Sequence, residues 1–201
     1  MNVGVTGHRW NRLGHGDLRL LRASVRGALE RIAESAPGQP LRLVSPLAEG
    51  ADRIVAEEAA ALGWQLQSAL PFAQAEYEKD FATTESRTEF RRLLARAAKV
   101  HELRGSRDSR ESRDSAYTAV GRLVLDSSDV LVAVWDGASA RGEGGTAQMV
   151  LEARERGLPV VWIPSEPPHE PKLLLPHASS RLSPEVLADL GARFAKPRPS
   201  V

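Results

Sequence analysis

The sequence contains no cysteine, which excludes disulfide frameworks, thiolate metal sites and cysteine nucleophiles. No apolar run approaches the roughly 18 residues of a membrane span, and the N-terminus has no signal-peptide pattern. We therefore expect a soluble, cytoplasmic protein without a membrane partner. The five histidines show neither HxH nor HExxH spacing, so we expect no metal site. We also expect no cofactor.

Neither sign of charge is in excess, because 27 Lys and Arg residues face 26 Asp and Glu residues. A chain with this balance lacks the domain-wide basic field that drives tight nonspecific binding to nucleic acid. A local basic patch is still compatible with this balance, but we do not expect a nucleic-acid partner. Lysine is scarce, so arginine dominates the basic residues. Arginine suits bidentate contacts to phosphate or carboxylate, although the codon bias of a GC-rich genome explains the same excess.

The 201 residues, of which 42% are hydrophobic, suffice for one globular domain with a modest appendage. Apolar runs typical of strands alternate with segments of helical apolar spacing. The predicted strands are 3–6, 41–45, 65–70, 99–103, 130–135 and 160–163. The predicted helices are 18–32, 51–62, 115–125 and 146–156, with polar helical material between 71 and 98. Asp17 is the predicted N-cap of the first helix. This alternation predicts an α/β fold of three layers, α/β/α, around a mostly parallel sheet of about six strands.

Two regions of different composition divide the chain. Residues 1–163 contain the alternating strands and helices, and we predict that they form the α/β domain. Residues 164–201 are a Pro-rich tail with a short C-terminal helix, in which Ser183 is the N-cap and Pro184 the first helical residue. We expect this tail to pack on the domain or on a partner.

The polar helical stretch 76–98 is long for a simple crossover, and Phe81, Phe90, Leu93 and Leu94 give it an apolar side. We expect a second copy of the chain to cover that side in a symmetric homodimer, which would let one subunit complete the other's pocket. The alternative is that these residues pack wholly within the monomer.

Ligands of open α/β sheets bind beyond the carboxyl ends of the strands. Gly7, His8 and Arg9 follow the first predicted strand. Gly7 permits close approach of the backbone, while His8 and Arg9 offer cationic donors to an anion. We predict that these three residues contact a phosphate. The alternative is that Gly7 only turns the chain and Arg9 pairs with a surface carboxylate.

The second strand leads into Ser45–Asp52. Gly50 begins the next helix, whose free N–H groups can face a phosphate or a sugar hydroxyl. Glu49 supplies carboxylate acceptors for ribose hydroxyls. Asp52 lies in the first helical turn, where a capping role is the more typical one.

Asp136 follows the fifth strand, and Gly142, Gly144, Gly145 and Thr146 lead into the next helix. A glycine-rich loop between a buried strand and a helix N-terminus forms an anion cradle, to which the Thr146 hydroxyl adds a donor. The loop is not a Walker A motif, because no lysine follows the glycines. We predict that the glycines and Thr146 bind a phosphate and that Asp136 binds ribose hydroxyls.

Two features lie near the helix 115–125. Tyr117 is predicted to stack on a ligand or hydrogen-bond to it at the rim of the site. The stretch Arg104–Asp114 is built from Ser-Arg-acid triplets, which are typical of a solvated loop or a frayed helix start. The alternative is an arginine-bearing lid over an anionic ligand.

Two of these segments resemble known motifs. The run Ser45-Pro-Leu-Ala-Glu-Gly-Ala-Asp52 resembles the "SGLAxGID" segment of the Smf/DprA domain, and Asp136 to Thr146 resembles the "PGGxGTxxE" loop of Lonely Guy phosphoribohydrolases. Together they resemble the SLOG superfamily over about residues 1–163. The resemblance implies a Rossmann-like domain that binds nucleotides or nucleotide-derived ligands; some members cleave an N-glycosidic bond and others only sense.

Met149 stands where the phosphoribohydrolases carry a catalytic Glu, and a thioether can neither accept a proton nor act as a nucleophile. The favoured interpretation is therefore a module that binds or senses a nucleotide or an ADP-ribose-like ligand. The first alternative is an N-glycoside hydrolase or transferase acting on nucleoside monophosphates through Glu152 or Glu49. The second is Smf/DprA-like DNA binding, which the near-neutral charge disfavours.

Overall fold

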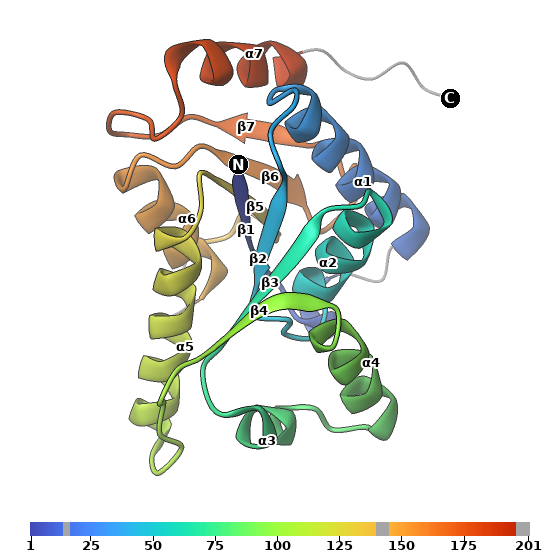
Figure 1. Ribbon diagram of the computed structural model, residues 1–201, viewed down its shortest axis with the longest axis vertical. Coiled ribbons are helices and arrows are strands. Elements are labelled where there is room, and N and C mark those ends of the chain that lie inside the picture. The colour runs from blue at the N-terminus through green and yellow to red at the C-terminus, as the bar shows by residue number, and fades with distance from the viewer. Residues whose placement is uncertain (14–16, 140–144, 196–201) are drawn as a thin grey trace.

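A seven-stranded sheet runs through the computed structural model, which describes residues 1–13, 17–139 and 145–195 (Figure 1). Its strand order is β4-β3-β2-β1-β5-β6-β7. All neighbouring strands are parallel except β6 and β7, which are antiparallel. The strands are β1 (Asn2–Gly7), β2 (Arg42–Ser45), β3 (Gln65–Leu70), β4 (Ala97–Glu102), β5 (Val130–Trp135), β6 (Val160–Pro164) and β7 (Lys172–Leu174).

Helices cover both faces of the sheet, with α5 and α6 on one side and α1, α2 and α4 on the other (Figure 1). The α-helices are α1 (Leu18–Glu34), α2 (Ala51–Ala61), α3 (Gln74–Tyr77), α4 (Thr84–Leu94), α5 (Arg110–Asp126), α6 (Thr146–Glu155) and α7 (Pro184–Ala195). Two 3-10 turns, η1 (Trp10–Arg12) and η2 (Glu78–Asp80), lie in loops. The predicted α/β fold of three layers is confirmed.

Strand β5 explains why the core has two halves. Val130, Val132 and Val134 belong to the cluster beneath α1 and α2, whereas the alternate residues Leu131 and Ala133 belong to the cluster beneath α5 and α6. Side chains of successive strand residues point to opposite faces of a sheet. A strand covered on both faces is therefore apolar throughout, which is why this run predicted the central strand correctly.

Local signals placed the element ends to within a few residues. Asp17 caps α1 as predicted, accepting a hydrogen bond from the Arg19 amide at 2.8 Å. Two boundaries differ. Helix α4 ends at Leu94 because β4 already begins at Ala97, and α5 begins earlier than predicted because Ser109 accepts a bond from the Ser112 amide. The Ser-Arg-acid stretch is therefore half loop and half helix.

The segment after residue 163 adds a strand that the sequence did not predict. Strand β7 pairs antiparallel with β6, with Leu173 opposite Val161, and α7 packs on β7 and α1. The boundary between residues 1–163 and 164–201 stays a prediction. In the part of the chain that the structure describes, no helix is long and apolar enough to cross a membrane.

One expectation about assembly needs correction. Phe81, Phe90 and Leu93 are fully buried within the chain, and Leu94 is buried beside them. Phe81 and Phe90 pack against each other, and both rings contact Tyr77 at centroid distances of 5.1 and 5.6 Å. The apolar side of 76–98 therefore needs no second copy to cover it. The homodimer stays a prediction, but the apolar side of residues 76–98 no longer supports it.

Candidate functional site

A cavity of about 430 Å³ opens at the carboxyl ends of β1 and β2 and extends beneath α5. Its volume lies in the range of small-molecule sites, which is roughly 300–1,000 Å³. Six residues predicted from sequence line it: Gly7, His8, Arg9, Tyr117, Gly145 and Thr146. We call the expectation that ligands bind beyond the carboxyl ends of the strands the strand-end rule. Residues from separate parts of the chain that this rule selected line the same cavity.

The mouth of the cavity is polar and cationic. Arg9 and Arg12 line it, with guanidinium groups that are about two-fifths exposed. Arg12 Nη2 lies 3.0 Å from Asp136 Oδ2, and His8 Nε2 lies 3.2 Å from the same oxygen. Burial would raise the pKa of Asp136, but the Ala138 amide, His8 and Arg12 outweigh it and hold that pKa below its ordinary value.

Asp136 itself does not line the cavity. The Asp136 carboxylate contacts Arg12 and His8, which do line the cavity. The position of Asp136 therefore does not support its predicted contact with a ribose. The deep part of the cavity is apolar, lined by Val5, Val120, Val124, Leu125, Leu131 and Met149.

One wall carries two buried polar side chains, Asp52 and Tyr77. Asp52 is 5% exposed, and its Oδ2 accepts a bond from the Ala48 amide at 3.3 Å. Burial raises the pKa of Asp52 to about 7, although this bond and the charges of Arg9 and Arg53 act against the rise. Tyr77 is 1% exposed. Burial, and then the charge of Asp52, raise the pKa of Tyr77.

Beside this wall, Asp80 holds the rim tyrosine in place. The Tyr117 hydroxyl donates to Asp80, Arg107 pairs with the same carboxylate, and Arg9 Nη2 lies 3.8 Å from it. Burial, and then the bond to Asp80, raise the pKa of Tyr117. The Arg107 guanidinium also stacks 4.7 Å from the Phe72 ring centroid. Arg107 is thus anchored against buried groups, which does not support the alternative of an arginine-bearing lid.

Gly7 and Gly50 are required by packing. A Cβ on Gly7 would lie 2.4 Å from Ala51 Cβ, and one on Gly50, whose φ is +92°, would lie 2.5 Å from the His8 carbonyl oxygen. This close approach lets the Ala51 amide donate to the His8 carbonyl at 3.0 Å. The first amide of α2 is therefore already bonded, contrary to the expectation that it faces a phosphate.

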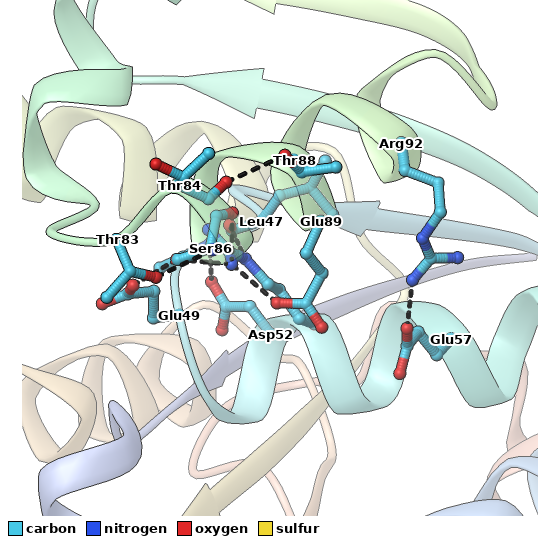
Figure 2. Close-up of polar contacts among 12 residues, drawn as sticks. Leu47, Glu49, Asp52, Glu57, Thr83, Thr84, Ser86, Thr88, Glu89 and Arg92 are labelled. Atoms are coloured by element: carbon cyan, nitrogen blue, oxygen red, sulfur yellow. Dashed lines mark hydrogen bonds and ion pairs between the residues drawn. The ribbon is translucent and has the colours of Figure 1, made fainter.

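Glu49, Gly50 and Asp136 are the described site predictions that do not line the cavity. The Ser86 hydroxyl donates to Glu49, which turns this carboxylate toward α4 (Figure 2). Gly142 and Gly144 lie outside the described residues. Of the predicted carboxylates that the structure describes, neither Glu49 nor Asp136 lines the cavity, whereas Asp52 does.

Comparison with solved structures identifies the fold. The chain is similar to DNA processing protein A (DprA) from Streptococcus pneumoniae, with a TM-score of 0.53 and 17% identity over 83% of this chain and 51% of that chain. It is similar to DprA from Helicobacter pylori, whose structure describes a single-stranded DNA binding mode, with a TM-score of 0.53 and 17% identity over 84% of this chain and 67% of that chain. The chain has the fold of these DprA proteins.

A scan against protein-family models and a search of curated proteins find no match. The chain spans about half the length of the pneumococcal DprA chain. At 17% identity the likeness establishes the fold and leaves the ligand open.

Met149 stands where the resemblance to the phosphoribohydrolases implies a glutamate, and the structure places it in the apolar interior of the cavity. Met149 is buried and lines the cavity, and a Cβ on Gly121 would lie 2.5 Å from its sulfur atom. Glu152 pairs instead with Arg122 at 3.0 Å and with Arg156, and does not line the cavity. Neither Glu152 nor Glu49 is therefore positioned to replace the missing glutamate.

A buried arginine on α2 supports the cavity wall that carries Asp52 and Tyr77. Arg53 is fully buried; its Nε donates to the Leu47 carbonyl at 3.1 Å, and its Nη1 donates to Ser86 Oγ at 2.9 Å and Glu89 Oε2 at 2.7 Å. Figure 2 shows these three partners gathered between α2 and α4. The guanidinium also lies 4.4 Å from the Phe81 ring centroid. Arg53 thus fixes the loop after β2 against α4.

Sequence reasoning missed part of this wall. The sequence predicts a helix cap at Asp52 and offers a lid as one interpretation of the stretch that contains Arg107, but it indicates no role for Tyr77 or Asp80. Tyr77 and Asp80 follow β3 at its carboxyl end, so the strand-end rule applied to the third strand as well would have found them.

Proposed function

We propose that the cavity binds a nucleotide or a nucleotide-derived, ADP-ribose-like ligand. The observation that carries this proposal is one continuous cavity with two arginines and a helix N-terminus at its mouth and an apolar interior. A nucleotide likewise has a charged part and an apolar part, because its phosphate is anionic and its base is flat and largely apolar on its faces.

The phosphate is assigned to the mouth. Arg9 and Arg12 supply charged donors, and Gly145 and Thr146 begin α6, whose N-terminal N–H groups and dipole favour an anion. Tyr117, half-buried and held by Asp80, lies where a base or sugar can pack against its ring. The apolar interior around Met149 suits the face of a base.

Ligand-induced stabilisation tests the proposal. Purified protein is screened by thermal shift and calorimetry against ribonucleoside mono- and diphosphates and ADP-ribose. A ligand at 100 times its Kd adds about 2.7 kcal/mol to the free energy of unfolding. Arg12→Gln removes one charge-assisted bond, and we expect it to weaken binding about tenfold.

Arg19→Gln is the matched control, since Arg19 is highly exposed and pairs locally with Asp17 outside the cavity. We expect this variant to bind like the wild type. Lack of response to every nucleotide in the panel would contradict the proposal. Equal losses in Arg12→Gln and Arg19→Gln would show that binding depends on net charge and not on this cavity.

DNA binding is a second candidate, favoured by the similarity of the fold to two DprA proteins. The near balance of charges argues against it. A fluorescent single-stranded oligonucleotide separates the two candidates. Binding to DNA predicts affinity that falls steeply with salt, whereas a mononucleotide that competes with the oligonucleotide would place both in the cavity.

A further inference from the structure

Two polar groups in the wall of the cavity have hydrogen-bonding capacity that the described residues do not use. Asp52 receives one bond, from the Ala48 amide, and leaves its other carboxylate oxygen without a donor. The Tyr77 hydroxyl has no hydrogen-bond partner among the described residues. Both side chains are at least nine-tenths buried and both line the cavity. Buried polar groups are normally paired, so this pair calls for a partner from outside the chain.

Neighbouring buried groups show the contrast. The Asp80 side chain is only 6% exposed, but it binds Arg107 and Tyr117. The fully buried side-chain atoms without a partner among the described residues are on Arg53, Ser68, Ser165 and His169, and these residues do not line the cavity. Asp52 and Tyr77 are therefore distinguished by facing the space where a ligand would lie.

The chemistry of the pair fits a sugar diol. A carboxylate accepts hydrogen bonds through two oxygens, and a phenol both donates and accepts. The 2′- and 3′-hydroxyls of a ribose present two adjacent donors that also accept. Asp52 comes from the first turn of the helix after β2 and Tyr77 from the helix after β3, at the strand ends where α/β folds bind their ligands.

We propose that Asp52 and Tyr77 form a ribose-diol subsite that makes the cavity selective for ribonucleotides over 2′-deoxyribonucleotides. This inference rests on the proposed function. It moves the sugar contacts predicted for Glu49 and Asp136 to a residue pair that lines the cavity. A ligand without the 2′-hydroxyl leaves one of these buried groups unpaired, which is the most effective basis for rejecting an analogue.

Calorimetry with matched pairs tests the subsite. The full chain is titrated with each ribonucleoside mono- and diphosphate and with its 2′-deoxy counterpart. We expect the ribonucleotide to bind at least tenfold more tightly to the wild type. Asp52→Asn preserves the shape of the side chain, and Tyr77→Phe removes only the hydroxyl. Both variants are expected to reduce the affinity ratio to within about threefold of unity.

Asp126→Asn is the matched control, because Asp126 is a mostly exposed carboxylate on α5 that does not line the cavity. It should keep the ratio of the wild type. Thermal unfolding of each variant verifies that it folds, and Tyr77→Phe by itself decides the test if Asp52→Asn does not fold.

The outcomes separate the two proposals. Equal binding of ribo- and 2′-deoxyribonucleotides by the wild type overturns the subsite and leaves the proposed function intact. A ratio that survives in Asp52→Asn or Tyr77→Phe, or that is lost in Asp126→Asn, also overturns the subsite. If no nucleotide binds at all, the proposed function fails and the subsite fails with it.

Discussion

The two sides of the cavity are built differently. The wall formed by α2, α3 and α4 rests on buried groups, with Arg53 bonded to three partners and Tyr77 enclosed by aromatic rings. The mouth formed by the loop after β1 carries partly exposed ion pairs, such as Arg12 with Asp136. Removing one partner of a buried ion pair or hydrogen bond costs a large part of the free energy of unfolding, so such contacts hold the wall in one geometry. Exposed ion pairs contribute little to stability, and a ligand can replace one of their partners.

This contrast makes stability and binding separable. Changes in the wall are expected to affect folding first, and changes at the mouth to affect ligand affinity first. The predictions below test that division, beginning with the largest expected effect on the free energy of unfolding.

Arg53→Ala should cost about 3–5 kcal/mol, because it removes the buried partner of Glu89 and of the Leu47 carbonyl. Urea denaturation measures the loss. Arg92→Ala is the control on the same face: its pair with Glu57 spans α4 and α2 but is half exposed (Figure 2), so we expect less than about 1 kcal/mol. Similar losses in both variants would refute the distinction between a buried and an exposed arginine.

Asp52→Asn should change how stability depends on pH. Burial raises the pKa of Asp52 from 3.8 to about 7, so the folded state holds a proton that the unfolded state releases. Stability from this group is greatest below about pH 4 and is lost as the pH rises through 7. The wild type should therefore lose roughly 4 kcal/mol more than Asp52→Asn between pH 4 and pH 8.

Urea midpoints across that pH range check this result. The charged and titratable groups around Asp52 are Arg9, Arg53 and Tyr77. Burial acts to lower the pKa of Arg9, but nearby negative groups outweigh it and raise that pKa. Burial raises the pKa of Tyr77, so both pKa values move further from the range between pH 4 and pH 8. The two proteins share all other groups, so the difference between their curves isolates Asp52. Parallel curves would mean that the carboxyl is solvated in solution.

Gly50→Ala should cost roughly 2–4 kcal/mol, since the new Cβ meets backbone of the His8–Arg9 loop at a strained φ. Gly63→Ala is the control, because Gly63 also has a positive φ, +79°, but no atom lies within 4 Å of its added Cβ. That variant should cost only about 1–2 kcal/mol. Thermal unfolding distinguishes the two variants. Equal losses of stability would show that the loop after β1 moves to accommodate the added methyl group.

Arg12→Gln should have the smallest effect on folding, below about 1 kcal/mol, because its pair with Asp136 is partly exposed. Its effect should be on nucleotide affinity instead. Denaturation and calorimetry on the same preparation measure both quantities. A loss of stability as large as that of Gly50→Ala would mean that the mouth, like the wall, is a structural element.

Much of the architecture was accessible from sequence because its signals are local. The apolar run Val130–Trp135 predicted a central strand, and Asp17 predicted a helix start. Strand β7 was missed, because three residues in a Pro-rich segment carry too short a pattern to predict pairing with β6. The strand-end rule likewise placed Arg9 and Thr146 at one cavity although they are far apart in the chain.

The sequence by itself determined the parallel α/β order and the edge of the sheet where a ligand can bind, because periodicity and strand polarity depend on neighbouring residues. It did not determine which carboxylates face that edge. Glu49 turns toward Ser86, Asp136 toward Arg12, and Asp52 into the cavity. These directions depend on α3, α4 and η1, which meet the strand ends only after the chain has folded. Tertiary packing therefore determined which side chains line the cavity.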